Sequence, residues 1–312
     1  MNLRGVCACL TLISVSELAA QSAPVPAPAQ GAQPISSCAP PGYDRDALLA
    51  LKQDKFAVAD DARRNALALA LGECLGDPDP LIRDGVAYEA LTHFMRGQQL
   101  TQATLVALRE RLLAQLRGPA GDGLVRPFAA LVLAEVARTD RIDPYLSPTE
   151  RADLVTAATE YVRGVTDYRG FDEREGWRHG VAHGADFLMQ LAYNPMVTHD
   201  DLRRILEAVA SQVAPPEHTY TAGESDRLAR PVIAVASRAA LTEGEWTAWF
   251  ARVGAPAPLA RWEDAHLSAL GLAKRHNTSA FLSFIHRAAK SESGAPLASL
   301  LPGVEAALGA LP

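Results

Sequence analysis

Apolar residues recur every three to four positions along most of the chain beyond Tyr43, and short runs of Gly, Pro and Asp interrupt them at close intervals. This spacing places the apolar side chains on one face of a helix, and the interruptions are typical of turns. The pattern predicts helices over Asp44 to Phe56, Asp60 to Leu75, Pro80 to Arg96, Thr101 to Leu116, Leu124 to Thr139, Pro148 to Tyr161, Glu173 to Tyr193, Thr198 to Gln212, Glu224 to Ala239, Thr242 to Arg252, Trp262 to Lys274, Thr278 to Lys290 and Leu297 to Leu311. No stretch predicts a strand. We therefore expect an all-α fold, an irregular α-solenoid or α/α array of antiparallel helix pairs joined by short connections.

The composition agrees with a single helical domain over residues 43–312. A hydrophobic content of 48% in 312 residues is enough for a large core, and aromatic residues make up only 6%. The 30 basic and 36 acidic residues form no basic cluster of the kind that neutralises a phosphate backbone. We therefore expect no nucleic-acid partner.

The first 22 residues have the pattern of a secretory signal. An arginine precedes an apolar stretch from Val6 to Val15, and small residues suited to a signal peptidase follow it. This stretch is too short to span a bilayer, which needs about 20 apolar residues, and no later segment reaches that length. Residues 23–42 are rich in Pro and Ala and predict an extended tether. We expect a periplasmic or secreted protein without a transmembrane segment in its mature chain.

The four cysteines divide between the predicted signal and the rest of the chain. Cys7 and Cys9 belong to the predicted signal, so Cys38 and Cys74 are the two that remain after export. In an oxidising compartment these two could form a disulfide that pins the tether to the first helices. The alternative, a buried apolar Cys74 and a free thiol at Cys38, stays open at this point.

One turn between two predicted helices has a recognisable form. The segment CLGDPDPLIRDGVAYEAL, from Cys74 to Leu91, resembles the turn of a HEAT repeat. Pro80 would stand in the first helical turn, where its missing N–H costs nothing, and Asp77 or Asp79 would cap the helix. Arg83 and Asp84 are interpreted as charges that tie one repeat to the next. The fold class is therefore an irregular, HEAT-like one.

Several segments together resemble the bacterial domain-of-unknown-function family number 2785. They are LGDPDPLIRDGVAYEAL, FAALVLAE, DYRGFDEREGWRHGVAHGADFL, GESDRLAR and HNTSAFL, which occur in this order from about Leu71 to Arg287. The block Gly-Trp-x-His-x-x-x-His-Gly-x-Asp is the most specific of them. The resemblance implies an all-helical domain, and it implies no reaction, cofactor or catalytic residue. The apparent export signal departs from the usual pattern of that family.

The histidine block, GWRHGVAHGADF, places several polar side chains on one helical face. On a helix from Glu173 to Tyr193, four side chains fall within roughly 60° of one another. They are His179, His183, Asp186 and Gln190. Gly180 and Gly184 would let neighbouring helices approach closely, at a helix-propensity cost of about 1 kcal/mol each. Trp177 would lie on the opposite face, in the core.

Three interpretations of this stripe are open. His179, His183 and Asp186 could bind a divalent metal such as zinc, which accepts N and O ligands; Gly180, however, occupies the position of the glutamate in H-E-x-x-H. His183 could instead act as a general base, although the sequence offers no nucleophile motif beside it. In the third interpretation the stripe is structural, with Arg169, Asp172 and Arg174 bracing the start of the helix.

Glu224 and Arg227, at the start of a later helix, could face the same groove as His179. The leading hypothesis is thus a binding or scaffold domain that holds an unknown protein or small molecule in a polar groove. The alternative is a metal-dependent hydrolase or lyase with His179, His183 and Asp186 as ligands and a remote Glu or Asp as base.

Overall fold

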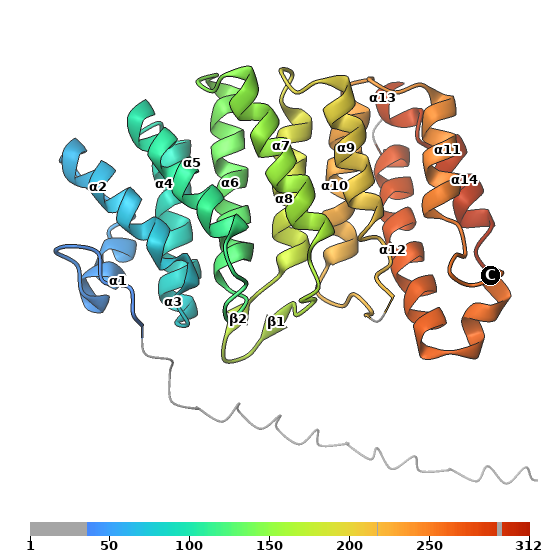
Figure 1. Ribbon diagram of the computed structural model, residues 1–312, viewed down its shortest axis with the longest axis horizontal. Coiled ribbons are helices and arrows are strands. Elements are labelled where there is room, and N and C mark those ends of the chain that lie inside the picture. The colour runs from blue at the N-terminus through green and yellow to red at the C-terminus, as the bar shows by residue number, and fades with distance from the viewer. Residues whose placement is uncertain (1–35, 217, 292–294) are drawn as a thin grey trace, which may run out of the picture. The chain divides into compact units, whose positions relative to one another are not determined.

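Helices follow one another along almost all of the chain that the computed structural model describes, which is residues 36–216, 218–291 and 295–312 (Figure 1). The α-helices are α1 (Arg45–Gln53), α2 (Asp61–Gly72), α3 (Pro80–Ile82), α4 (Glu89–Arg96), α5 (Gln102–Arg117), α6 (Val125–Ile142), α7 (Pro148–Arg163), α8 (Gly180–Tyr193), α9 (His199–Ala210), α10 (Glu224–Ser237), α11 (Glu243–Val253), α12 (Ala269–Ser291), α13 (Ala295–Ala298) and α14 (Leu301–Gly309). Shorter turns of other helix types are η1 (Glu73–Gly76), η2 (Arg83–Tyr88) and η3 (Trp262–Leu267). The predicted all-α fold is confirmed. The predicted signal, residues 1–22, lies outside the described residues.

Alternate helices pack side by side, which produces two layers. One layer runs through α4, α6, α8, α10 and α12, and the other through α2, α5, α7 and α9 (Figure 1). Each layer presents its apolar face to the other, and the core between them contains fully buried phenylalanines such as Phe94, Phe128 and Phe187. α8 and α10 are neighbours in the first layer, so side chains from both can line one site.

Side-chain caps explain where many of the helices begin. Ser147 and Thr242 each form a reciprocal capping box with a glutamate three residues later, at the starts of α7 and α11. Asp79 caps α3 by accepting a hydrogen bond from the backbone N–H of Leu81, and Pro80 occupies the first turn as expected. The sequence had left Asp77 and Asp79 as alternatives for this cap.

The predicted helix over Glu173 to Tyr193 is wrong at its start. α8 begins at Gly180, and the preceding residues form a hairpin of two short strands, β1 (Phe171–Asp172) and β2 (Gly176–Trp177), so the expectation of no strands is also wrong. The carboxylate of Asp172 accepts hydrogen bonds from the backbone of Arg174 and Glu175, and Gly176 has a positive φ of 73°. These features close a turn that a helix cannot accommodate.

The predicted break between Lys274 and Thr278 is also absent. α12 continues through this region as one helix of 23 residues, and only η3 stands apart from it. The polar run Lys-Arg-His-Asn at residues 274–277 contains neither Gly nor Pro, so it does not interrupt the backbone.

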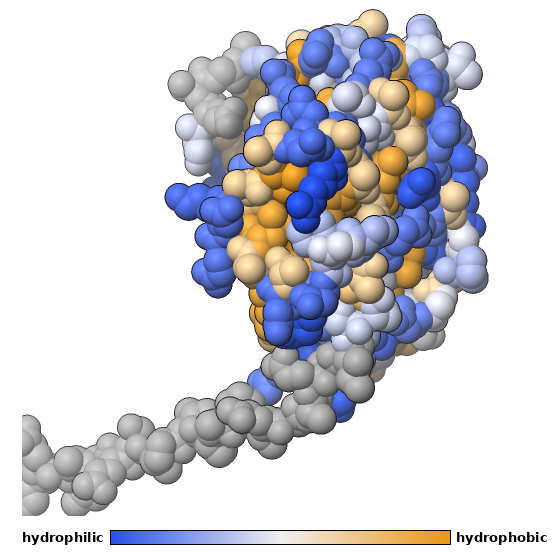
Figure 2. Space-filling model, turned by 90° about the vertical axis from the view of Figure 1, so that its left-hand side faces the viewer, coloured by the Kyte–Doolittle hydropathy of each residue, from blue (hydrophilic) through white to orange (hydrophobic). Residues whose placement is uncertain are grey.

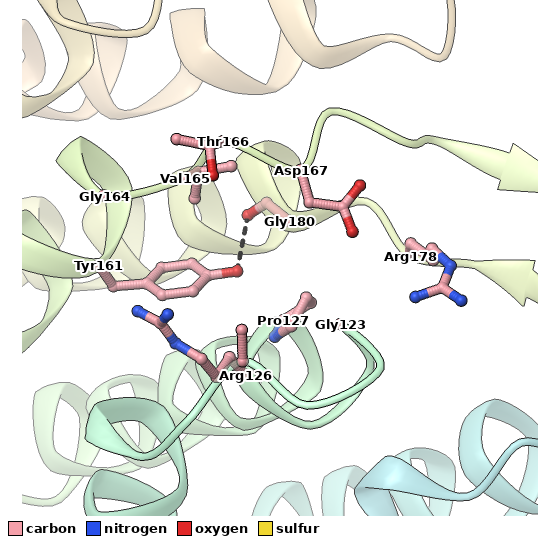
Figure 3. A pocket seen from close by; sticks show the side chains of 11 residues that line it. Gly123, Arg126, Pro127, Tyr161, Gly164, Val165, Thr166, Asp167, Arg178 and Gly180 are labelled. Carbon is pink, nitrogen blue, oxygen red and sulfur yellow. Dashed lines mark hydrogen bonds between the residues drawn. The ribbon is translucent and has the colours of Figure 1, made fainter.

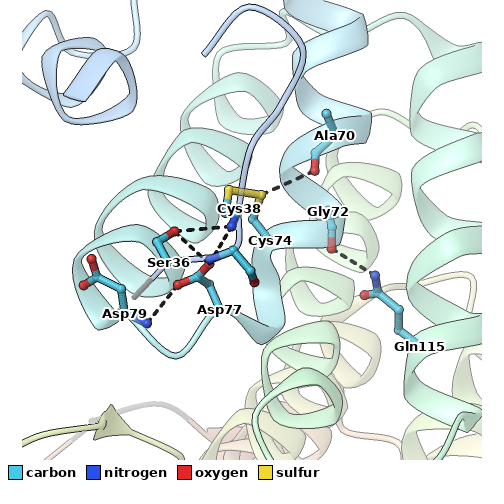
Figure 4. Close-up of a disulfide and its surroundings, with 9 residues drawn as sticks. Ser36, Cys38, Ala70, Gly72, Cys74, Asp77, Asp79 and Gln115 are labelled. Atoms are coloured by element: carbon cyan, nitrogen blue, oxygen red, sulfur yellow. Dashed lines mark hydrogen bonds between the residues drawn. A yellow bond between two sulfur atoms is a disulfide. The ribbon is translucent and has the colours of Figure 1, made fainter. Parts of the chain in front are cut away.

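Cys38 and Cys74 are joined by a disulfide (Figure 4). Beside it, the Asp77 carboxylate accepts hydrogen bonds from Ser36 Oγ and from the backbone N–H groups of Ser37 and Cys38. The bond closes a loop with a sequence separation of 36 residues. In the chain-entropy picture, such a loop contributes about 4 kcal/mol to stability.

Figure 2 shows the surface at the end of the fold that contains α1 and α2, where apolar residues gather between polar ones. Within the described ranges, none of the helices has both the length and the apolar character needed to cross a membrane.

Candidate functional site

A cavity of about 590 Å³ lies beside α8 and α10, and we call it the His179 cavity. Its lining comes from the β-hairpin, α6, α8, the start of α10 and the η2–α4 segment. The lining residues are Asp84, Tyr88, Glu89, Phe128, Leu131, Trp177, His179, His183, Asp186, Ala222, Gly223, Asp226, Arg227 and Arg230. Four residues that the sequence singled out as one groove therefore do share a cavity. They are His179, His183, Asp186 and Arg227.

His179 stands immediately before α8, in the left-handed backbone region, with φ 50°. Its ring stacks on that of Trp177, with 4.6 Å between the centroids. Its Nε2 lies 2.9 Å from the carbonyl oxygen of Ala222. Because a carbonyl can only accept, Nε2 carries the proton and Nδ1 keeps a lone pair. Burial lowers the pKa of His179, and the neighbouring charge of Arg227 adds to the effect while that of Glu224 opposes it.

His183 lies one turn further along α8 and is only 5% exposed. Its ring meets the edges of Phe128 and His179, with centroid distances of 5.0 and 5.7 Å. Burial places the pKa of His183 well below its usual value, and the nearby charges of His179 and Arg227 lower it further. The Pro127 carbonyl opposes this shift weakly. Among the described residues, Nδ1 of His183 is buried without a hydrogen-bond partner.

Asp186 and Arg227 form an ion pair across the gap between α8 and α10. The Nε group of Arg227 donates to Asp186 Oδ1 over 2.8 Å, and Nη2 donates to Oδ2. Burial lowers the pKa of Arg227 to about 10, helped by the like charge of Arg230. Each carboxylate oxygen of Asp186 therefore already has a cationic donor.

The predicted metal ligands are not arranged as a ligand set. Within the part of the chain that the structure describes, no group of three or more His, Cys, Asp or Glu side chains is placed to hold a metal ion. One physical reason is that both carboxylate oxygens of Asp186 accept hydrogen bonds from Arg227. A metal bound by Asp186 would have to compete with Arg227 for the carboxylate oxygens.

Two other predicted groove residues lie beside the cavity and do not line it. Gln190 accepts a weak hydrogen bond of 3.4 Å from Arg141, two turns away from His183 along α8. Glu224 accepts a hydrogen bond from the backbone N–H of Ala222, and its other oxygen is 3.9 Å from Nε2 of His179. Glu224 thus supports the loop that holds His179.

The braces predicted for the helix start have other partners. Asp167 is paired with Arg169, and Asp172 caps the turn of the hairpin. Trp177 was expected in the core, but it is 40% exposed and lies against Phe171 and His179. The expectation for Trp177 is therefore wrong, because it belongs to β2 and not to the buried face of a helix.

Arg83 connects the turn before α3 to the hairpin, a contact that the sequence interpretation of Arg83 as a tie between repeats did not predict. Its guanidinium is fully buried, donates to the carbonyls of Glu175 and Trp177 at 2.7 and 3.3 Å, and also binds the carbonyl of Asp77 at 3.1 Å. It lies over the ring of Phe128, 4.7 Å from the centroid. This one side chain therefore joins the turn before α3, the hairpin and Phe128 of α6.

The wall formed by Asp84, Tyr88 and Glu89 was also missed as part of the site. Burial raises the pKa of Asp84, while the charge of Arg83 opposes the rise. The only signal for this wall was the unusual Gly-Asp-Pro-Asp-Pro turn that precedes it. That signal indicated a repeat and gave no indication of a groove.

A second cavity, of about 80 Å³, lies behind the hairpin (Figure 3). The hydroxyl of Tyr161 donates to the carbonyl of Gly180 over 3.2 Å, and Asp167 and Arg178 line the opposite side. This volume has room for a few water molecules. It is therefore a packing feature that supports the start of α8.

Comparison with known proteins identifies the family of the chain and does not indicate its function. No curated protein and no solved structure matches the chain. A family model described as a protein of unknown function, DUF2785, matches residues 112–286, which include α8, the hairpin and α10. These residues are more than half of the 312 in the chain, and they contain the histidine block. The chain belongs to the DUF2785 family.

Proposed function

We propose that this protein is an exported binding domain whose small-molecule ligand occupies the His179 cavity. The observation that carries the proposal is that polar side chains from separate elements, most of them buried, converge on one cavity. These side chains are His179, His183 and the Asp186–Arg227 pair. A concave site where fixed polar groups converge beside apolar surface is a candidate small-molecule site.

The unpartnered nitrogen of His183 supports this proposal. Leaving a buried polar atom without a hydrogen bond costs about 1–3 kcal/mol, so such atoms are rare in folded proteins. His183 Nδ1 is one of them, and its ring lines the His179 cavity. A site that holds a strained or unsatisfied group at a cavity is a candidate for function.

The backbone conformation of His179 also supports the binding proposal. A side chain other than Gly at φ 50° is uncommon and is held there by its surroundings. Here the stack on Trp177 and the bond to Ala222 hold the imidazole at the cavity wall. The alternative of a metal-dependent hydrolase or lyase would require Asp186 to leave Arg227, so binding agrees better with the geometry.

Two finer parts of the proposal concern export and the repeat. The disulfide between Cys38 and Cys74 supports an oxidising compartment, periplasmic or secreted. The alternate packing of helices in two layers and the capped turn at Asp79 support a HEAT-like relationship.

Export is tested by the intact mass of the protein recovered from its own host. Loss of about the first 22 residues is expected, and a full-length cytoplasmic chain contradicts it.

The binding proposal is tested by thermal unfolding in the presence of a panel of amino acids, sugars, nucleosides, polyamines and organic acids. We expect at least one compound class to raise the Tm of the wild-type protein, since a ligand that binds only the folded state stabilises it. Leu131→Trp, which fills the cavity, should abolish the shift. Leu272→Trp, at an exposed leucine of α12, should retain it.

If no compound raises the Tm of the wild-type protein, the proposal fails. It also fails if the Leu131→Trp variant responds as strongly as the wild type, because binding then lies elsewhere. A circular-dichroism spectrum of each variant, compared with that of the wild type, shows whether the helices are intact.

A further inference from the structure

The lining of the His179 cavity divides into a buried wall and an exposed rim. The wall consists of Phe128, Leu131, His179, His183 and Asp186, all of which are buried. The rim includes Asp226 and Arg230 of α10, both of which are exposed. A ligand in this cavity therefore meets two different environments.

The buried wall is close to neutral overall. The two imidazoles are uncharged at neutral pH, because burial lowers the pKa of both. The charge of Asp186 is balanced by that of Arg227. Phe128 and Leu131 add apolar surface to this wall. An apolar or aromatic group would gain from burial against it, at about 25 cal/mol per Å², whereas a charged group would lose its hydration without a free counter-charge.

The exposed rim has two opposite charges that are not engaged within the described structure. Asp226 and Arg230 are four residues apart on α10, so they project from the same side of the helix. Neither forms an ion pair with any of the described residues. Asp84 and Glu89, which also line the cavity, do have partners. Asp84 is paired with Arg83, and Glu89 is paired with Lys52.

These two rim charges suit a ligand with one anionic and one cationic group. A guanidinium recognises a carboxylate through two parallel hydrogen bonds, and a carboxylate accepts hydrogen bonds from an ammonium. Along a helix, four residues correspond to about 6 Å, so the carboxylate of Asp226 and the long side chain of Arg230 can contact neighbouring groups of one small molecule.

We propose that the His179 cavity binds a free α-amino acid with an apolar or aromatic side chain. The carboxylate of the ligand pairs with Arg230, its ammonium group pairs with Asp226, and its side chain lies against Phe128 and Leu131. This assignment rests on the proposed function, because it names the class of ligand for the same cavity. The volume of about 590 Å³ is within the range of small-molecule sites, which is about 300–1,000 Å³.

Isothermal titration calorimetry with four probes tests the assignment. The probes are L-phenylalanine, L-phenylalaninamide without the carboxylate, N-acetyl-L-phenylalanine without the ammonium, and glycine without the side chain. The wild-type protein should bind L-phenylalanine, and each of the other three should bind about tenfold more weakly or worse. The first two lack a charge-assisted hydrogen bond, and glycine lacks the apolar group that is buried against Phe128 and Leu131.

Two variants assign each charge to its partner. In Arg230→Gln, L-phenylalanine should bind about tenfold more weakly, and removing its carboxylate should then have little further effect. In Asp226→Asn, L-phenylalanine should also bind about tenfold more weakly, and removing the ammonium group of the ligand should then have little further effect. Arg252→Gln and Asp200→Asn are matched controls at exposed positions of α11 and α9, and both should bind L-phenylalanine as the wild type does.

The assignment is overturned if L-phenylalanine does not bind, if all four probes bind equally, or if the two variants leave the preferences unchanged. Failure of this assignment can be told apart from failure of the proposed function. A panel compound of another class that stabilises the wild type but not the Leu131→Trp variant would keep the cavity as a binding site and remove only the amino acid as its ligand.

Discussion

The imidazole of His179 donates a hydrogen bond of 2.9 Å from Nε2 to the carbonyl oxygen of Ala222. The bond joins the residue before α8 to the loop before α10, 43 positions apart in the sequence. It therefore fixes the beginnings of two helices that contribute to the same cavity. It also fixes the tautomer of the imidazole, because Nε2 must carry the proton.

Replacing His179 by alanine should destabilise the fold. His179→Ala removes the bond to Ala222 and the stack on Trp177, and we expect the free energy of unfolding to fall by about 1–3 kcal/mol. Urea denaturation measures this change. His266→Ala, at an exposed histidine of η3, should stay within about 0.5 kcal/mol of the wild type. An equal effect of both substitutions would show that the bond to Ala222 contributes no stability.

Stability should fall as the pH decreases below about 6.5. The folded-state pKa values of His179 and His183 lie below the unfolded value of about 6.5, chiefly because both rings are buried. Above pH 6.5 both states are neutral and this contribution is fully present. Between pH 6.5 and 5 the unfolded chain takes up protons that the folded chain does not, and each imidazole can contribute up to about 1.4 kcal/mol per pH unit.

The change in unfolding free energy between pH 7.5 and 5, measured in urea, checks this dependence. His183→Gln removes one titrating ring and should make the decrease shallower. His266→Gln should leave it as in the wild type. A His183→Gln variant that keeps the full slope would mean that another group causes the decrease.

Two glycines in helices should respond in opposite ways to alanine. A Cβ at Gly184 would lie 2.6 Å from Val162 Cγ2 and 3.0 Å from Tyr161 Cε1, which confirms that this glycine permits close packing. Gly184→Ala should therefore cost about 1–3 kcal/mol. A Cβ at Gly244 in α11 meets nothing within 4 Å, so Gly244→Ala should stabilise by about 0.5–1 kcal/mol. Thermal unfolding of the two variants decides the prediction, and destabilisation by both would contradict it.

The disulfide should make a large contribution to the stability of the N-terminal helices. The Cys38→Ala/Cys74→Ala double variant should lose about 4 kcal/mol, because its unfolded chain is no longer restricted by the loop. Wild-type protein reduced under denaturing conditions should lose about the same amount. Both are measured by urea denaturation, and a loss below about 1 kcal/mol in the double variant would show that the contacts of Asp77 hold this segment without the bond.

Most helix positions were predictable because their ends have chemical signals. The helix predicted from Thr242, for example, does begin there, and Thr242 forms a capping box with Glu245 at the start of α11. The start of α8 was not predictable in this way, because the apolar period continues into the hairpin. The helix does not extend into the hairpin, because Gly176 and His179 have positive φ angles. A positive φ at a histidine has no signature in the sequence.

The candidate site was predicted in part. The common face of His183 and Asp186 follows from helical spacing alone, and it was correct. The ion pair of Asp186 with Arg227 and the contacts of Arg83 with the hairpin join residues 41 to 94 positions apart. Such contacts depend on how helices pack across layers, which local periodicity does not determine.

The contacts of Arg83 also bear on how this family should be delimited. The matched region starts at residue 112, whereas Asp84, Tyr88 and Glu89, which line the His179 cavity, and Arg83, which contacts the hairpin, precede it. A fragment trimmed to residues 112–286 would leave the carbonyls of Glu175 and Trp177 without their guanidinium, and it would open one side of the cavity to solvent. Sequence comparisons that begin at residue 112 would likewise overlook one wall of the site. The structural unit that encloses the cavity begins earlier, at the turn that contains Asp77 and Asp79.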